Sequence, residues 1–81
     1  MHTSTYRVII EPDGRYFHAY VPALPGCHTF GKTLAETKKN VREAIQVYLE
    51  SLLLDRQPIP TDYNSFEYHE TIELKKQLVY A

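Results

Sequence analysis

The stretch Val21-Pro22-Ala23-Leu24-Pro25-Gly26-Cys27-His28-Thr29-Phe30-Gly31 decides the fold, because the hydrophobic period changes across it. Before it, apolar residues recur with the period of a β-strand, and after it they recur with the period of a helix. Its prolines and glycines interrupt regular structure on both sides. We call residues 21–31 the elbow, and it predicts a hairpin upstream and one long helix downstream.

Two short runs upstream of the elbow, residues 6–11 and 16–21, predict a β-hairpin with a turn at residues 12–15. Period two divides the second run into a core face and a face of aromatic rings. The core face holds Phe17, Ala19 and Val21, and the aromatic face holds Tyr16, His18 and Tyr20. Residues 27–30 are long enough for a short third strand.

Downstream of the elbow, the run Thr33-Leu34-Ala35-Glu36 predicts a capping box, in which Thr33 and Glu36 each bond the other's backbone N–H. The predicted helix runs to about Asp55, because Pro58 and Pro60 prevent a longer one. At 100° per residue, one narrow stripe forms its core face. The stripe comprises Leu34, Val41, Ile45, Tyr48 and Leu52.

Three apolar helix residues, Val47, Leu53 and Leu54, lie outside this stripe. They are either scattered surface residues, which are common, or a second contact face for another subunit. We take them as the candidate oligomer interface. Residues 56–70 predict a polar connection, and the alternation in residues 71–80 predicts a final strand. The whole chain, residues 1–81, is thus expected to be one α+β domain of order β-β-β-α-β, with an antiparallel-rich sheet and the helix packed on one face.

The composition restricts the classes of function. The 81 residues carry a net charge of −1, so no basic field suggests a nucleic-acid partner, although a tyrosine-rich strand face could stack bases. The single cysteine excludes an internal disulfide and fits a reducing cytoplasm. No apolar run is long enough to span a membrane. Seven tyrosines in so short a chain either suit a protein-binding surface or include several that simply line strand faces.

The sequence gives no pattern for catalysis, a metal or a cofactor. His18 and His28 stand ten residues apart without the short ligand spacings of a zinc site. Cys27 and His28 are neighbours in a predicted strand, so they point to opposite faces and cannot form a nucleophile–base pair. We therefore expect a non-enzymatic protein with no cofactor.

The spaced residues from the hairpin to the helix together resemble the HicB-like antitoxin family. The matching string consists of Asp13-Gly14, Phe17-His18-Ala19-Tyr20-Val21-Pro22, Leu24-Pro25-Gly26-Cys27-His28-Thr29, Gly31-Lys32-Thr33, and Asn40 with Glu43-Ala44-Ile45. The resemblance implies a reduced ribonuclease-H-like fold. It also implies a cytoplasmic antitoxin that binds and masks a HicA-type mRNA-cleaving toxin and forms dimers or larger assemblies.

The chain departs from the family pattern in one way that affects function. Many members carry a C-terminal DNA-binding domain, and this sequence ends after its last predicted strand, so no direct DNA binding is expected. The partner-binding candidates are Tyr16, His18 and Tyr20 on the aromatic face. Two alternatives stay open, namely an orphan structural or regulatory oligomer without a toxin, and a hydrolase or nuclease.

Overall fold

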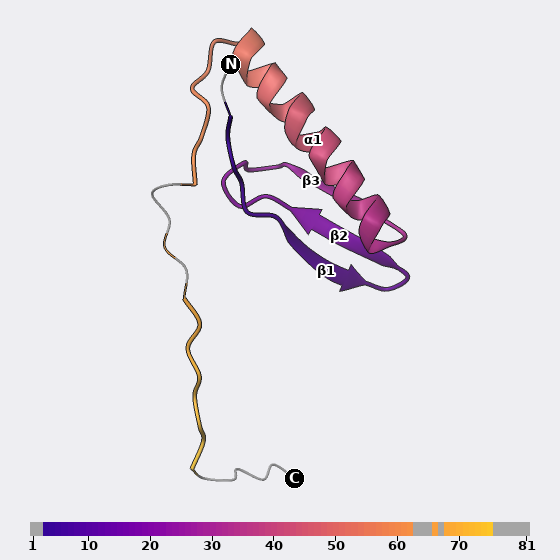
Figure 1. The fold of residues 1–81 in the computed structure, drawn as a ribbon, viewed down its shortest axis with the longest axis vertical. Coiled ribbons are helices and arrows are strands. Elements are labelled where there is room, and N and C mark those ends of the chain that lie inside the picture. Colours follow the sequence, from indigo (N-terminus) through magenta and orange to yellow (C-terminus); the bar gives the residue numbers. More distant parts are fainter. Residues whose placement is uncertain (1–2, 63–65, 67, 76–81) are drawn as a thin grey trace.

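The fold is a three-stranded antiparallel sheet with one long helix, seen in a computed structural model that describes residues 3–62, 66 and 68–75 (Figure 1). The strands are β1 (Ile9–Asp13), β2 (Tyr16–Tyr20) and β3 (His28–Gly31), and the helix is α1 (Leu34–Leu54). The strand order in the sheet is β1-β2-β3, and both neighbouring pairs are antiparallel. This arrangement confirms a small α+β domain.

The β1–β2 hairpin is tighter than the sequence suggested. Pro12 and Asp13 belong to β1, opposite Phe17 and Tyr16, and only two residues form the turn. Gly14 is the first of these and takes a φ of 62°, a left-handed conformation that glycine adopts at little cost. A proline is tolerated in β1 because β1 is an edge strand, which needs hydrogen bonds on one side only.

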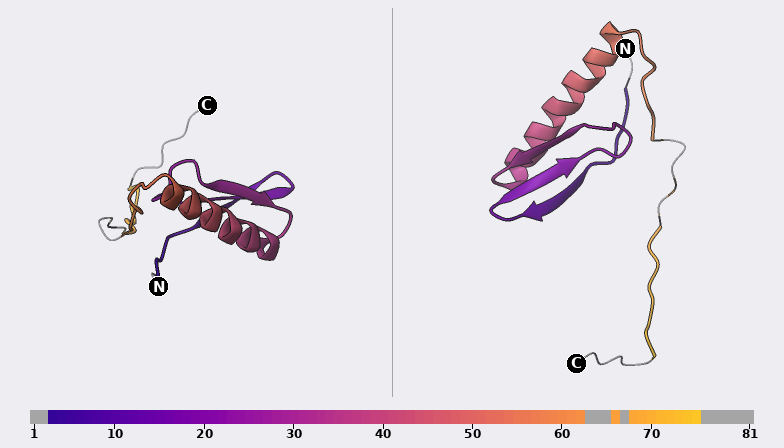
Figure 2. Two further views of the ribbon diagram at one scale, coloured as in Figure 1. Left: turned by 90° about the horizontal axis from the view of Figure 1, so that it is seen from above. Right: turned by 180° about the vertical axis from the view of Figure 1, so that it is seen from behind.

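The helix covers one face of the sheet and leaves the other open (Figure 2). Ala19 and Val21 are buried beneath it, as the period-two pattern predicts, whereas Phe17 is only half-buried. The fully buried members of the core come from β2, the elbow and α1. They are Ala19, Val21, Leu24, Cys27 and Val41.

Leu24 is buried although it lies in no helix or strand. Three backbone hydrogen bonds hold the elbow closed around it: Val21 N–H to Cys27 O at 3.1 Å, Leu24 N–H to Val21 O at 3.0 Å, and Cys27 N–H to Leu24 O at 3.0 Å. Gly26 takes a left-handed φ of 83°, which lets the chain turn back so that Cys27 lies next to Val21. The elbow is thus a compact loop that inserts a leucine into the core and carries the chain from β2 to β3.

The N-terminus of α1 is capped by Thr33, whose Oγ accepts the backbone N–H of Glu36 at 3.0 Å. The return bond differs from the expected one. The Glu36 carboxylate accepts the N–H of Lys32 at 3.1 Å, one residue before the cap. The glutamate therefore anchors the chain entering the helix, and the start of the helix is as predicted.

Thr33→Ala is expected to lower the free energy of unfolding by about 1 kcal/mol, because the Glu36 N–H loses its acceptor. Urea denaturation followed by circular dichroism measures this change. Thr71→Ala serves as the control, since Thr71 is exposed and lies outside every helix and strand. Equal midpoints for the two variants would contradict the cap.

The helix ends where the sequence predicts, but without the usual glycine. Asp55 is the C-cap, and Arg56 takes a left-handed φ of 54° just beyond it. The N–H of Arg56 bonds Leu53 O at 3.1 Å, and that of Gln57 bonds Leu52 O at 2.8 Å. These two bonds form a Schellman motif, which satisfies carbonyls that the helix end leaves open.

The predicted helix stripe is correct in its middle and wrong at its start. Val41 is buried, and Ile45 and Tyr48 pack against the core. Leu34, by contrast, is 51 % exposed, and Thr37 occupies the buried position at this end of the helix. The helix and β3 are in close contact at this point, because a Cβ added to Gly31 would overlap the backbone and side chain of Thr37.

The final strand predicted for residues 71–80 does not form in the part that the structure describes. Residues 68–75 are exposed and belong to no helix or strand, and residues 76–80 lie outside the described residues. The segment stands apart from the domain (Figure 1). The Cα radius of gyration of 17.4 Å accordingly exceeds the value of about 12 Å for a compact chain of this length.

Candidate partner-binding face

The open face of the sheet gathers the aromatic residues that the sequence singled out. Tyr16, His18 and Tyr20 project from β2 on the side opposite the buried Ala19. Strand pairing adds two neighbours, since His28 lies opposite Tyr20 and Phe30 lies opposite His18. We call these five residues of β2 and β3 the aromatic face.

His18 lies at the centre of the aromatic face. Its ring centroid is 4.9 Å from that of Phe30, 5.6 Å from that of His28 and 5.8 Å from that of Tyr20. Such distances are those of packed rings, which present a large, rigid contact area. Tyr16 and Phe30, at 48 % and 49 % exposure, keep about half of their surface available to a partner.

Acidic side chains border the aromatic face on one side. Glu11 pairs with His18 and Asp13 pairs with Tyr16, so both carboxylates lie on the same face of the sheet as those rings. Both residues are exposed. An aromatic centre with an acidic border is complementary to a surface that carries arginine or lysine.

The arrangement gives no support for catalysis or metal binding at Cys27 and His28. Cys27 is buried, and burial raises the pKa of its thiol, which makes it a poorer nucleophile. His28 is exposed on the opposite side of β3. Within the described residues, no three His, Cys, Asp or Glu side chains cluster in a way that could hold a metal ion.

The three candidate oligomer residues do not share one environment. Val47 is 64 % exposed and lines a groove with Asn40 and Ala44 beside β3. Leu54 is 85 % exposed at the end of α1. Leu53, also 64 % exposed, instead borders a cavity on the other side of the helix end. Their role in self-association stays a prediction.

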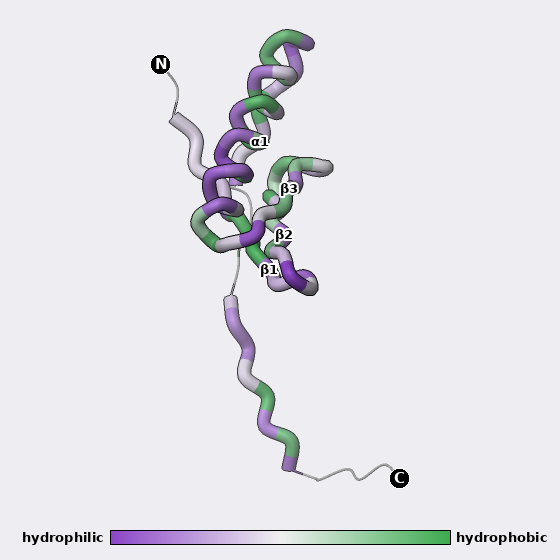
Figure 3. The backbone as a smooth tube through the Cα atoms, turned by 90° about the vertical axis from the view of Figure 1, so that its right-hand side faces the viewer, coloured by the Kyte–Doolittle hydropathy of each residue, from purple (hydrophilic) through white to green (hydrophobic). Residues whose placement is uncertain are grey.

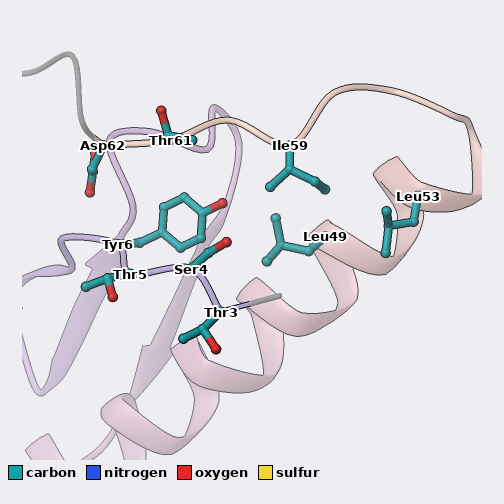
Figure 4. Close-up of a pocket in the computed structure, with 9 residues that line it drawn as sticks. All are labelled: Thr3, Ser4, Thr5, Tyr6, Leu49, Leu53, Ile59, Thr61 and Asp62. Carbon is teal, nitrogen blue, oxygen red and sulfur yellow. The ribbon is translucent and has the colours of Figure 1, made fainter. Parts of the chain in front are cut away.

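That cavity, of about 490 Å³, lies between the C-terminal half of α1, residues 3–6 and the loop after the helix (Figure 4). Leu49, Leu53 and Ile59 form its apolar wall, and Thr3, Ser4 and Thr5 lie on the other side. Among the described residues that line it, Asp62 carries the one carboxylate, and none is a histidine, lysine or cysteine.

Two hydrogen bonds close the cavity by joining the loop after the helix to the chain before β1. The Tyr6 hydroxyl donates to Pro60 O at 2.6 Å, and the Arg7 N–H donates to Asp62 Oδ2 at 2.6 Å. Asp62 Oδ1 is buried without a partner among the described residues. Residues 59–62 therefore run parallel to residues 3–7.

The sequence pattern missed His28 and Phe30 as members of the aromatic face. The signal was present, because period two places them on the same side of the third strand. The pattern does not say which side of β3 matches which side of β2. That requires the pairing of Phe17 with Gly31, which the elbow sets.

The fold and the face together define a small α+β domain whose sheet is covered on one side and open on the other. The chain belongs to the HicB-like antitoxin family of bacterial toxin–antitoxin systems, whose model matches residues 6–80. The resemblance read from the motif string is therefore confirmed, and it extends beyond the helix.

Curated relatives are similar over most of the chain. A UPF0150 protein of Synechocystis is 46 % identical over 59 residues, covering 70 % of this chain and 73 % of that protein. A UPF0150 protein of Thermoplasma acidophilum is 50 % identical over 58 residues, covering 70 % and 84 %. A 14.9 kDa protein of Haemophilus phage HP1 is 32 % identical over 74 residues, covering 91 % and 56 %. No solved structure matches the chain significantly.

Among the helical residues that the structure describes, none form a stretch long and apolar enough to cross a bilayer.

Proposed function

We propose that this protein is a non-catalytic antitoxin that binds a HicA-type mRNA-cleaving toxin and masks it through the aromatic face. The observation that carries the proposal is an open, ring-packed sheet face with an acidic border in a chain of this family. Masking requires surface complementarity alone, and aromatic anchors supply most of the binding energy in many interfaces.

The charges favour a basic partner. A ribonuclease that grips RNA needs lysine and arginine on its substrate face. Glu11 and Asp13 can form ion pairs with such residues, and the neighbouring rings of β2 and β3 can exclude water from these ion pairs. Occupation of the RNA-binding surface would stop cleavage, with no chemical step by the antitoxin.

Phe30→Lys is expected to weaken toxin binding by about 30-fold or more, because it removes an aromatic anchor and adds a charge that repels a basic surface. Calorimetry with a purified HicA-type toxin measures the affinity. An RNA-cleavage assay with and without the antitoxin measures protection. The variant should protect RNA only at correspondingly higher concentration.

Leu34→Lys is a matched control for this experiment. Leu34 is 51 % exposed and Phe30 is 49 % exposed, so the two changes alter charge and accessible apolar surface in similar ways on different faces. Binding by the Leu34 variant should stay within about twofold of the original. An equal loss of toxin affinity in the two variants would show that the aromatic face is not the binding site. If the original protein does not bind the toxin at all, the proposal that it neutralises a HicA-type toxin is wrong.

An orphan oligomer without a toxin is the second candidate function, favoured by the exposed apolar residues Val47 and Leu54 on α1. It predicts self-association but no inhibition of any ribonuclease. The purified chain should also leave RNA intact on its own under the antitoxin and the orphan proposals. Cleavage that depends on one acidic residue of this chain would instead indicate a nuclease.

A further inference from the structure

We propose that residues 68–75 form a β-strand on the free edge of β1 in a second copy of the chain, so that two copies exchange strands. The first observation is the segment itself. Tyr68, Ile72 and Leu74 are 79 %, 73 % and 79 % exposed and all stand at even positions, whereas the odd positions from 69 to 75 are polar. Glu70 is the one polar residue among the even positions. Period two of this kind is the pattern of a strand with one buried face.

No described part of the chain covers the apolar side of this segment. It stands away from the domain, and hydrophobic positions alternate along it with hydrophilic ones (Figure 3). An extended chain with large exposed apolar side chains gains free energy by adding to a sheet edge, which supplies both hydrogen bonds and burial.

The matching surface is a groove beside β1. It has a volume of about 380 Å³ and lies between β1 and α1, which packs mainly over β2 and β3. Val8, Ile10, Val41 and Ile45 provide its apolar lining. In the described part of the chain, no strand pairs with the outer edge of β1. A strand added there would place alternate side chains next to Val8 and Ile10, over this groove.

The groove carries positive charge, and the segment carries a negative charge on its apolar side. Lys38 and Arg42 of α1 complete the groove lining. Glu70 stands at an even position, like Tyr68 and Ile72, and therefore shares their side of the extended segment. A strand that directs this side toward the groove brings the Glu70 carboxylate to the two cations.

The position of the segment's tether favours a second copy over the same chain. Asp62 bonds Arg7, and residues 59–62 run parallel to residues 3–7. In a one-for-one parallel register, a strand continuing along its own β1 reaches Asp13, the last residue of β1, at about residue 68. Ile72 and Leu74 would then lie past the hairpin turn and stay uncovered, whereas a second copy offers its whole free edge.

Pro12 limits where the exchanged strand can pair. It has no N–H, so backbone hydrogen bonds on the outer edge of β1 and of the residue before it are available mainly along residues 8–11. An edge of this length can pair with the few residues around Ile72 and Leu74. Reciprocal exchange about a two-fold axis would cover both grooves with one kind of contact.

The test uses the full chain without toxin, so it is independent of the proposed antitoxin function. Ile72→Lys with Leu74→Lys should raise the dimer dissociation constant at least about 100-fold, measured by sedimentation equilibrium, because four lysines would enter two apolar grooves. His69→Lys with Thr71→Lys is the matched control on the other side of the strand and should leave the constant within about threefold. None of these four side chains belongs to the domain core, so the variants should stay folded.

Mixing separates exchange from other modes of association. Val8→Lys, at a position 37 % exposed, damages the groove and keeps the segment, whereas the Ile72 and Leu74 variant keeps the groove and damages the segment. Each alone should be monomeric, and an equimolar mixture should form a heterodimer with one intact exchange. A monomeric original protein, a dimer insensitive to both variants, or amide protection of residues 70–74 that is independent of concentration would overturn the proposal.

Discussion

Gly31→Ala is expected to destabilise the domain by about 3 kcal/mol or more, and to lower its melting temperature by more than about 10 °C. Gly31 is the last residue of β3 and is buried under the first turns of α1. A Cβ at this position would lie 2.3 Å from Thr37 Oγ1, 2.6 Å from Thr37 N and 2.8 Å from Thr37 Cα. Two of these three atoms are backbone, so a rotamer change cannot relieve the overlap.

The overlap matters because α1 is fixed to β3 at this point. Thr37 is fully buried and donates its hydroxyl to Thr33 O at 2.7 Å, and Asn40 donates its side-chain amide to Phe30 O at 2.8 Å. Moving the helix outward by the required distance would break the Asn40 bond and open the core. Thermal denaturation followed by circular dichroism measures the loss.

Two further variants identify the cause of the Gly31 effect. Gly14→Ala has open space around its Cβ and suffers only from its positive φ, so it should cost about 1–2 kcal/mol. Combining Gly31→Ala with Thr37→Ala should not restore stability, because the overlap with the Thr37 backbone persists. Restoration by the second substitution would show that the side chain alone sets the distance between helix and strand.

Periodicity predicted the elements that local sequence controls. The alternation in residues 16–21 placed Ala19 and Val21 in the core, and the Thr33 cap and Pro58 gave the limits of α1. These predictions held because each depends on neighbours within a few residues. The aromatic set Tyr16, His18 and Tyr20 was found in the same way, and it lies on the side of β2 away from the buried Ala19.

The remaining features depend on contacts between distant segments. The apolar stripe predicted that Leu34 would be buried in the core. In the structure Leu34 is half exposed, and Thr37 is the buried residue at the start of the helix, where it lies close to Gly31. His28 and Phe30 join the aromatic face through strand register. The alternation near Ile72 predicted a final strand, but residues 68–75 form none. A strand needs an edge to pair with, and this segment pairs with no described strand.

Leu24→Ala is expected to lower the free energy of unfolding by about 3 kcal/mol, within the usual range for a buried leucine. Leu24 is fully buried, and it is the largest completely buried apolar side chain among the described residues. Its truncation leaves a cavity that the elbow cannot close easily, because backbone hydrogen bonds from Val21, Leu24 and Cys27 fix the loop. Urea denaturation at constant pH measures the change.

Leu34→Ala is the control for Leu24→Ala, and together they decide where the core lies. Leu34 is half exposed at the first position of α1, where alanine is a good helix former, so its loss should cost less than about 0.5 kcal/mol. Equal costs would mean that the core extends along the helix stripe. A large cost for Leu24 alone would mean that the elbow is part of the core. The proline and glycine residues around Leu24 then act by directing one leucine inward, and the position of β3, with its share of the aromatic face, follows from that insertion.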